Sequence, residues 1–231
     1  LLEAIATRAT PLADGLAAGV EAAAERFGGD GLIPSVKGLE LPNYDPRAAP
    51  SMALAYATSD RGACHRRALP IEREPFEGEW TPAEAAGAVI EEQDRRAAQW
   101  CLIVDDFAGA AIENGGADWL AALEHPADTA ALESLGERVW TLTRLFNVRE
   151  GWRRADDTLP PVLTEGLVEG RDVDGIDEAR FEAMLEAYYA RRDWGPEGRP
   201  TRALVERLGL APVVDDEALL ADGRATTTGG T

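Results

Sequence analysis

Apolar residues recur at intervals of three and four along most of the chain, which is the pattern of amphipathic helices. The pattern predicts helices over residues 2–8 and 12–27, and the pair Gly28-Gly29 is expected to end the second one. The following stretch, 31–42, is short and punctuated by glycine and proline. We expect it to be a connector with a brief strand over residues 36–41.

The rest of the chain continues the helical pattern. Thr81, Pro82 and Glu84 form a favourable helix start, with an N-cap hydroxyl, a proline at the first position and a glutamate at the third. Residues 68–81 carry two prolines and several glutamates, which predicts an exposed loop. There is no internal repeat and no alternation long enough for a sheet, so the fold class is mainly α, an irregular multi-helix domain. The predicted helices span residues 48–59, 82–105, 128–146, 177–192 and 200–208.

Length and composition bound the answer further. With 231 residues and 45% hydrophobic side chains, the chain can build one or two domains with a real core. No apolar run approaches the roughly 18 residues of a membrane span, so no membrane association is expected. The sequence shows no initiator Met and no leader, and it begins in mid-helix, which suggests a fragment. Two cysteines make no disulfide framework, so we expect a reducing, cytoplasmic compartment, and the final ATTTGGT is predicted to be a disordered tail.

The charge balance is strongly acidic, with 42 acidic against 23 basic side chains and a net charge of −19. Such a chain repels phosphate backbones, which argues against nucleic-acid binding. Lys37 is the single lysine. A GC-rich genome would explain the abundance of Ala, Gly, Arg and Asp, whereas a salt-rich cytosol would explain both the carboxylate excess and the missing lysines, because molar salt screens self-repulsion. We favour the halophile interpretation.

The segment SMALAYATSDRGACH, residues 51–65, holds the clearest candidate chemistry. A helix of small residues leads into Gly62, Ala63 and Cys64 and ends on His65, one of two histidines in the chain. Imidazole can give and take a proton near neutral pH, so His65 is a candidate catalytic residue. The alternative is a histidine that only hydrogen-bonds a neighbouring helix. Cys64 is expected to be a small packed residue without a catalytic role.

Three further segments, in the same order and at workable spacing, resemble the same family. They are VKGLELPNYDPRA (36–48), ERVWTLTRLFNVREGWRRADDTLPPVL (137–163) and YYARRDWGPEGRPTRALVERLGL (188–210). All four segments resemble the C-terminal half of the tungsten-containing aldehyde ferredoxin oxidoreductases, over roughly residues 1–210. The resemblance implies that residues 1–38 end the second helical domain of that family and that residues 39–231 form the third, with the tail from about 223. It also places His65 beside a tungsten site, where it would assist proton movement.

The segment EEQDRRAAQWCLIVDDF, residues 91–107, departs from the family motif. Many members have Asp-x-x-Gly-Leu-Cys here, in a loop that contacts the pterin and supplies the fourth ligand of a [4Fe–4S] cluster. An ungapped comparison puts Trp100 and Ile103 at the motif's Asp and Gly, and Val104 and Asp105 at its Leu and Cys. The resemblance thus implies that Val104 and Asp105 bind the pterin cofactor.

The identity of the cluster ligand stays open at this point. Cys101 and Asp105 are spaced i and i+4, so on a continuous helix they would share a face, and a shift of one turn, about 5.4 Å, could exchange them. Asp105 could ligate the metal, Cys101 could do so by rearrangement, or the fourth ligand could be missing. In the simplest alternative, Asp105 and Asp106 are a solvated helix end.

The carboxylate pair at 156–157 and three of the tryptophans are expected to be structural. Asp156-Asp157 resembles a metal site only superficially, and an arginine–carboxylate cluster that holds a turn is the better interpretation, with Arg149, Arg153 and Arg154 nearby. The tryptophans at 140, 152 and 194 are expected in the core or between helices.

The resemblance implies the C-terminal part of an enzyme that oxidises aldehydes to carboxylic acids, a fragment not active alone. Tungstopterin and a [4Fe–4S] cluster would be held mostly by N-terminal regions, because no Cys-x-x-Cys-x-x-x-Cys run occurs in this sequence. Ferredoxin and an aldehyde would be its partners, and a homodimer is left open. The alternative is a non-catalytic helical scaffold or partner-binding module that lost the redox centre, which the aspartate at 105 favours and the His65 motif opposes.

Overall fold

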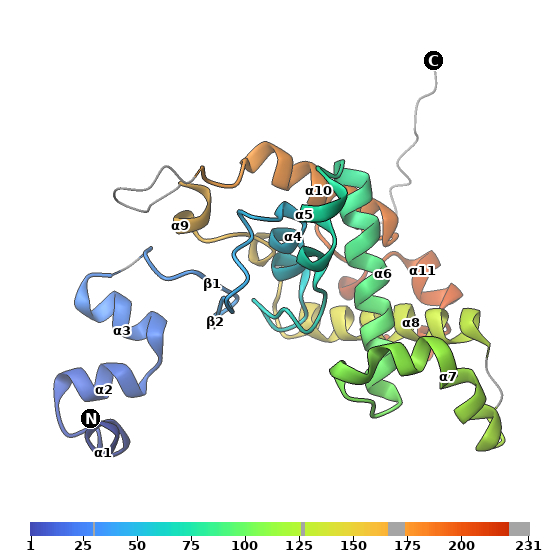
Figure 1. Cartoon of the computed structure of the whole chain (residues 1–231), viewed down its shortest axis with the longest axis horizontal. Helices are drawn as coiled ribbons and strands as arrows, with labels where there is room; N and C mark the ends of the chain where they lie inside the picture. Colours follow the sequence, from blue (N-terminus) through green and yellow to red (C-terminus); the bar gives the residue numbers. More distant parts are fainter. Residues whose placement is uncertain (30, 126–127, 166–173, 222–231) are drawn as a thin grey trace.

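The computed structural model describes residues 1–29, 31–125, 128–165 and 174–221, and helices dominate this part of the chain (Figure 1). This confirms the predicted mainly α fold class. None of the helices among these residues is long and apolar enough to cross a lipid bilayer. The α-helices are α1 (Leu2–Thr7), α2 (Pro11–Ala17), α3 (Val20–Phe27), α4 (Pro50–Thr58), α5 (Glu74–Glu77), α6 (Pro82–Cys101), α7 (Gly109–Ala122), α8 (Thr129–Arg149), α9 (Pro161–Thr164), α10 (Glu178–Arg191) and α11 (Arg202–Arg207), and the short 3₁₀ turns are η1 (Pro70–Glu72), η2 (Asp106–Ala108), η3 (Arg154–Asp156), η4 (Ala211–Val213) and η5 (Glu217–Leu219).

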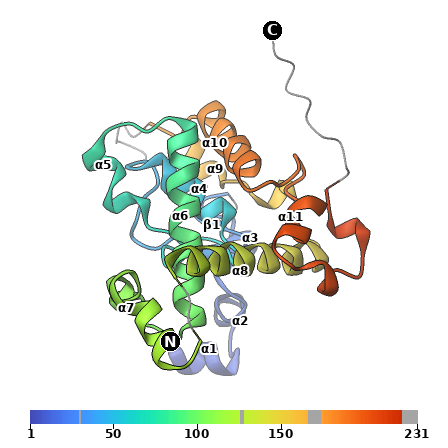
Figure 2. The ribbon, with the colours of Figure 1, turned by 90° about the vertical axis from the view of Figure 1, so that its right-hand side faces the viewer.

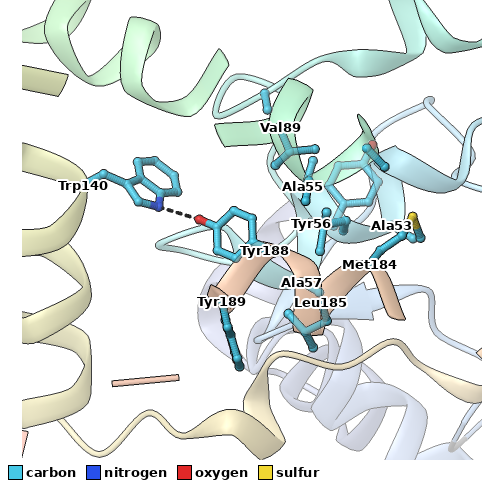
Figure 3. Packing of buried hydrophobic residues seen from close by; sticks show 14 of the residues in the cluster. Ala53, Ala55, Tyr56, Ala57, Val89, Trp140, Met184, Leu185, Tyr188 and Tyr189 are labelled. Carbon is cyan, nitrogen blue, oxygen red and sulfur yellow. Dashed lines mark hydrogen bonds between the residues drawn. The ribbon is translucent and has the colours of Figure 1, made fainter. Parts of the chain in front are cut away.

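The core forms where α6 crosses α8 and packs along α10 (Figure 2). Helix α4 contacts both α6 and α10. Residues 51–58 of α4 are all buried, and most have small side chains, so neighbouring helices approach this helix closely on all sides. Tyr56 and Tyr188 fill the space that the small residues leave, and the Trp140 indole N–H donates to the Tyr188 hydroxyl at 2.9 Å (Figure 3). The helices α1–α3 pack on one another and lie to one side of this core in Figure 1.

Side-chain caps fix several helix starts. The Thr81 hydroxyl accepts from the Glu84 backbone N–H while the Glu84 carboxylate accepts from the Thr81 backbone N–H, which is the predicted capping box of α6. The Asp177 side chain accepts from the Arg180 backbone N–H at the start of α10, and the Thr201 hydroxyl accepts from the Leu204 backbone N–H at the start of α11. These local signals explain why the predicted starts of these helices agree with the structure to within about two residues.

The N-terminal prediction was wrong in one respect. The predicted helix over residues 12–27 is two helices, α2 and α3, which break at Ala18 and Gly19. Gly19 has φ +103°, a conformation that glycine adopts without steric cost, so the chain turns there. Gly28, at φ +80°, ends α3 as predicted.

Two connecting segments are more ordered than predicted. In place of one strand over residues 36–41, β1 (Ser35–Val36) and β2 (Leu39–Glu40) form an antiparallel hairpin. Residues 68–81 are not simply an exposed loop, since they include η1 and α5 and bury Glu74. The Glu74 carboxylate accepts from the backbone N–H and hydroxyl of Ser51, and so caps α4 from a distant segment.

The predicted helix over residues 82–105 ends earlier, at Cys101, and α7 was not predicted at all because its glycines obscure the helical pattern. The predicted tail, from about residue 223, lies outside the described residues. The predicted domain boundary after residue 38 falls within the hairpin turn and stays a prediction.

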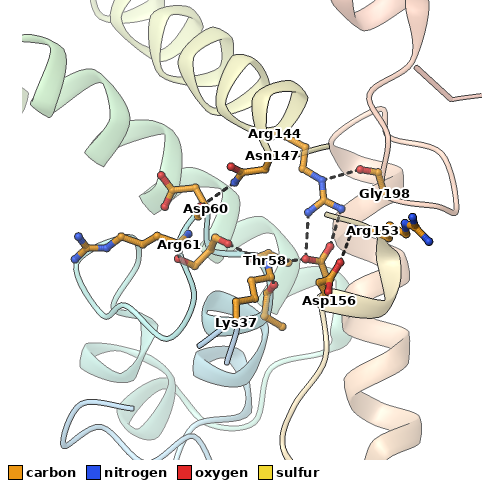
Figure 4. A network of polar contacts seen from close by, with 12 residues as sticks. Lys37, Thr58, Asp60, Arg61, Arg144, Asn147, Arg153, Asp156 and Gly198 are labelled. Atoms are coloured by element: carbon orange, nitrogen blue, oxygen red, sulfur yellow. Dashed lines mark hydrogen bonds and ion pairs between the residues drawn. The ribbon is translucent and has the colours of Figure 1, made fainter. Parts of the chain in front are cut away.

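A buried charge network joins the hairpin to the helical core. Asp157 is fully buried, and its carboxylate contacts the Lys37 ammonium at 2.7 Å and the Arg144 guanidinium at 2.8 Å, and also accepts from the Tyr189 hydroxyl. Figure 4 shows Lys37 and Arg144 converging on this site, with Arg144 also donating to the Gly198 carbonyl at 2.8 Å. Burial alone would raise the pKa of Asp157, but the two cations outweigh it and hold that pKa below its ordinary value.

We predict that Asp157→Asn lowers the free energy of unfolding by about 3–5 kcal/mol, because it leaves two buried cations without a counter-charge. Denaturant titration at pH 7 measures this loss. The neighbouring Asp156, an exposed residue, provides the matched control, since Asp156→Asn should cost no more than about 1 kcal/mol.

The pH dependence supplies a second check on the same carboxylate. Because the folded pKa of Asp157 is depressed, its contribution is fully present above the unfolded pKa of about 4 and is lost as pH falls through the folded pKa. The stability difference between wild type and Asp157→Asn should therefore shrink only below about pH 4. Equal costs for the two variants at pH 7 would contradict this account of the network.

Candidate functional site

His65 opens a turn that follows α4. The helix ends at Thr58, residues 59–64 run along the core, and His65 is half-buried at the start of the turn. Its ring lies against Tyr44, with ring centroids 5.2 Å apart and a tilt of 42°. The imidazole is therefore neither directed into bulk water nor sealed in an apolar core.

Polar contacts hold the segment before His65 in place. The Asn147 side chain of α8 donates to the Asp60 carbonyl at 2.8 Å, a contact visible in Figure 4, and the Asp60 carboxylate pairs with Arg67. Cys64 is buried, as predicted for a packed residue, and its sulfur accepts from the Arg61 guanidinium at 3.0 Å. Both sides of the turn are thus tied to the core.

The second candidate segment is the loop after α6. Gln99, almost fully buried, donates its side-chain amide to the Asp105 carbonyl at 2.7 Å and to the Val104 carbonyl at 3.4 Å. The Val104 backbone N–H donates back to the Gln99 carbonyl at 3.3 Å. One buried glutamine therefore closes the loop over residues 100–105.

The structure brings the two candidate segments together. The Arg67 guanidinium lies 4.0 Å from the centre of the Trp100 ring, and the Arg66 guanidinium lies 4.7 Å from the centre of the Phe107 ring. Both are cation–π distances. The turn that carries His65 therefore stacks on the loop that carries Val104 and Asp105, although some 40 residues separate them in the sequence.

The structure corrects one expectation about the cluster ligand. Cys101 and Asp105 do not share a helical face, because α6 ends at Cys101 and Ile103 then adopts φ +56°. Exchange of the two side chains by a one-turn helical shift is therefore excluded for this backbone. The Cys101 thiol is exposed, with a pKa raised by partial burial, and the exposed Asp105 carboxylate accepts from the Phe107 backbone N–H at 2.9 Å. The side chain of Asp106 lies outside the described residues.

The described donor side chains fit one part of a metal site and not a complete metal site. Among the described residues, no group of three or more His, Cys, Asp and Glu side chains could hold a metal ion. Iron–sulfur clusters take four protein ligands. Among the described side chains of the loop over residues 100–107, Asp105 is an exposed oxygen donor and Cys101 an exposed sulfur donor, so these side chains fit a contribution of one ligand to a cluster and not a complete cluster site.

The carboxylate pair at 156–157 is structural, as predicted, but with different partners. Asp157 binds Lys37 and Arg144 rather than the neighbouring arginines. Asp156 accepts from the Arg153 backbone N–H at 2.6 Å and so holds the local turn. Of the three tryptophans expected in core positions, Trp140 and Trp194 are buried, and the ring of Trp152 packs against the Lys37 ammonium at 4.6 Å.

A cavity of about 780 Å³ lies elsewhere, between α6, α7 and α8. Asp94, which lines it, has a pKa raised to about 6, because burial outweighs its contact with Arg192 at 2.6 Å. His65 is not among the lining residues. This cavity and the candidate chemistry at His65 are therefore separate features of the described structure.

Sequence reasoning missed Gln99, Arg66 and Arg67 as organisers of the site. A glutamine in a helix and two arginines in a turn carry no local signal of burial or stacking. The one available hint was Trp100, an aromatic residue next to a turn in an arginine-rich chain.

The comparisons with known proteins cover most of the chain. The family model described as "Aldehyde ferredoxin oxidoreductase, domains 2 & 3" matches residues 1–210. The tungsten-containing aldehyde ferredoxin oxidoreductase of Thermococcus kodakarensis is 36% identical over 226 residues, covering 91% of this chain and 36% of that protein. The protein of the same name from Pyrococcus furiosus is 36% identical over 211 residues, covering 86% of this chain and 34% of that protein. The chain thus spans about a third of the length of these relatives.

We predict that Ile103→Gly raises the free energy of unfolding by about 1 kcal/mol. Ile103 is β-branched, yet it adopts φ +56°, and with 94% of its surface exposed it gains little from burial. Ile103→Val keeps the branched side chain and should change the stability by less than about 0.5 kcal/mol. Denaturant titration of the two variants makes the comparison, and a loss of stability in Ile103→Gly would mean that the residue is not strained.

Proposed function

Since the chain belongs to the aldehyde ferredoxin oxidoreductase family, we propose that it is the C-terminal helical part of such an enzyme. The reaction would convert an aldehyde and water to a carboxylic acid, with two electrons and two protons removed and the electrons passed to ferredoxin. Because the chain spans about a third of its relatives, this part would not be active alone. One observation carries the proposal, namely that the His65 turn stacks on the loop over residues 100–107.

His65 would be the catalytic residue of this part. In the loaded enzyme, a tungsten–pterin centre supplies the two-electron chemistry. The His65 ring lies against Tyr44, with ring centroids 5.2 Å apart, and the residue is half-buried, so the ring is held in position without being sealed in the core. An imidazole held in this way can accept the proton that is released when water adds to the aldehyde carbon.

The loop over residues 100–107 would face the cofactors. Val104 and Asp105 would contact the pterin, and Asp105 would supply the one cluster ligand that this chain offers. A carboxylate is a harder donor than a thiolate, so an aspartate ligand should alter the reduction potential of a [4Fe–4S] cluster. Gln99 holds the backbone of this loop through two carbonyls and leaves the Asp105 side chain exposed.

The remaining expectations belong to the same proposal. We place the enzyme in the cytoplasm of a halophile, on its acidic composition and single lysine. Its domain boundary would follow residue 38, and ferredoxin and an aldehyde would be its partners, with a homodimer as the assembly to look for. A non-catalytic helical scaffold is the second candidate, and the aspartate at 105 is the observation that favours it.

We predict that His65→Asn lowers kcat of the tungsten-loaded enzyme by about 10²–10⁴-fold, because it removes the proton acceptor and keeps a similar volume. Activity and metal content are measured on the same preparation, and the tungsten content should not change. The second histidine, His125, provides the matched control, and His125→Asn should retain full activity. Loss of tungsten in His65→Asn would instead assign a structural role to His65.

The ligand proposal predicts different outcomes for two neighbouring variants. Electron paramagnetic resonance of the reduced cluster should change in Asp105→Ala, because the carboxylate ligand is lost, and should not change in Cys101→Ser. In Asp105→Cys the cluster should persist with a shifted reduction potential, since a thiolate replaces the carboxylate. A change confined to Cys101→Ser would identify the thiolate as the ligand. A wild-type enzyme with no cluster signal and no turnover would favour the scaffold alternative.

A further inference from the structure

Lys37, the single lysine of the chain, is buried, with only 3% of its side chain exposed. It occupies the two-residue turn between β1 and β2 together with Gly38, and both residues have positive φ, +53° and +77°. Positive φ at both central positions is the geometry of a tight hairpin turn. A lysine at such a turn would ordinarily extend into water, so its burial needs an explanation.

The Lys37 ammonium reaches the end of α4. Its Nζ donates to the Ala57 carbonyl at 2.6 Å and to the Ser59 carbonyl at 3.0 Å, and it contacts the Asp157 carboxylate at 2.7 Å. Carbonyls at a helix C-terminus lack helical partners and carry partial negative charge. The cation thus satisfies the last turn of α4 and is itself neutralised by Asp157.

The backbone of the same hairpin holds the next stretch of chain. The Ala63 backbone N–H donates to the Val36 carbonyl at 3.3 Å. At Gly62, which has φ +102°, a Cβ atom would lie 2.2 Å from that same carbonyl, so the hairpin and the segment touch with no room for a side chain. The hairpin therefore contacts residues 57–63 at both ends, through Lys37 at the first end and through the Val36 carbonyl at the second. His65 follows two residues later.

We propose that Lys37 is a positioning residue for His65. Through its two carbonyl contacts and its ion pair with Asp157, the ammonium sets where α4 ends and thereby where the turn of His65 begins. The proposal rests on the catalytic role proposed for His65, but the position of the ring can be measured without turnover.

A purely structural role for Lys37 is the competing explanation. An apolar side chain of similar length would fill the same space, so loss of volume is not what the ammonium prevents. It would, however, leave the Ala57 and Ser59 carbonyls without the Lys37 donor, and Asp157 would lose one of its two cationic partners and keep Arg144. Lys37→Met makes this change, because it keeps an unbranched side chain and removes the charge.

The experiment uses the two histidines as reporters. With ¹³C-labelled histidine in the 231-residue chain, the ring Cε1–H signals of His65 and His125 are resolved and assigned from His125→Gln. With wild type and variant compared at the same pH, Lys37→Met should move or split the His65 signal, because the ring shifts relative to Tyr44. The His125 signal should stay in place. A matched control is Leu204→Ala, which truncates a buried residue of α11 and should leave both signals unchanged in the folded protein.

Turnover gives the second readout. In the tungsten-loaded enzyme, Lys37→Met should lower kcat on the order of 100-fold with unchanged tungsten content, as expected for a misplaced catalytic group. A folded Lys37→Met chain whose His65 signal coincides with that of wild type would overturn the proposal. If instead the signal moves as expected but the wild-type enzyme oxidises no aldehyde, the positioning role stands and the proposed function fails.

Discussion

The buried carboxylate of Asp157 is the interaction on which the rest of this structure depends. It forms ion pairs with Lys37 of the hairpin and Arg144 of α8 and accepts a hydrogen bond from the Tyr189 hydroxyl of α10. These three segments are far apart in the sequence. A buried ion pair adds little stability over well-packed apolar groups, because desolvation offsets its attraction. Its consequence here is geometric. Apolar side chains could pack in several registers, whereas a carboxylate with three donors permits one.

Two sets of contacts of different strength connect this carboxylate to the candidate site. The first set is strong, because Lys37 and the hairpin backbone hold residues 57–63 through short contacts in the core. The second set is weaker. Arg66 and Arg67 stack on aromatic rings at the surface, where such contacts contribute about 0.5–1 kcal/mol each. The His65 turn is thus held by contacts in the core, whereas the stacking that joins this turn to the loop over residues 100–107 is weaker.

The parts of this fold that could be predicted from sequence are those whose cause is local. The Thr81 capping box and the cap at Asp177 lie within three residues of the groups they satisfy, and the starts of these two helices were predicted correctly. The prediction failed where the cause lies far along the chain. Glu74 was expected in an exposed loop but caps α4, and Lys37 carried no sign that it would meet a carboxylate 120 residues later. A motif singled out His65, whose role stays a prediction, whereas Gln99 organises the neighbouring loop without any motif.

Ile103 shows that the loop after α6 takes its backbone conformation from its surroundings rather than from its own residue preferences. A β-branched residue at φ +56° persists only where its surroundings impose the conformation. The surroundings here are the Gln99 contacts on one side and the Arg67–Trp100 stack on the other. The loop therefore holds a backbone conformation suited to glycine with an isoleucine in place. Since the surroundings and not the side chain at 103 impose this backbone, the loop would present the side chain of Asp105 in the same way with a glycine at 103.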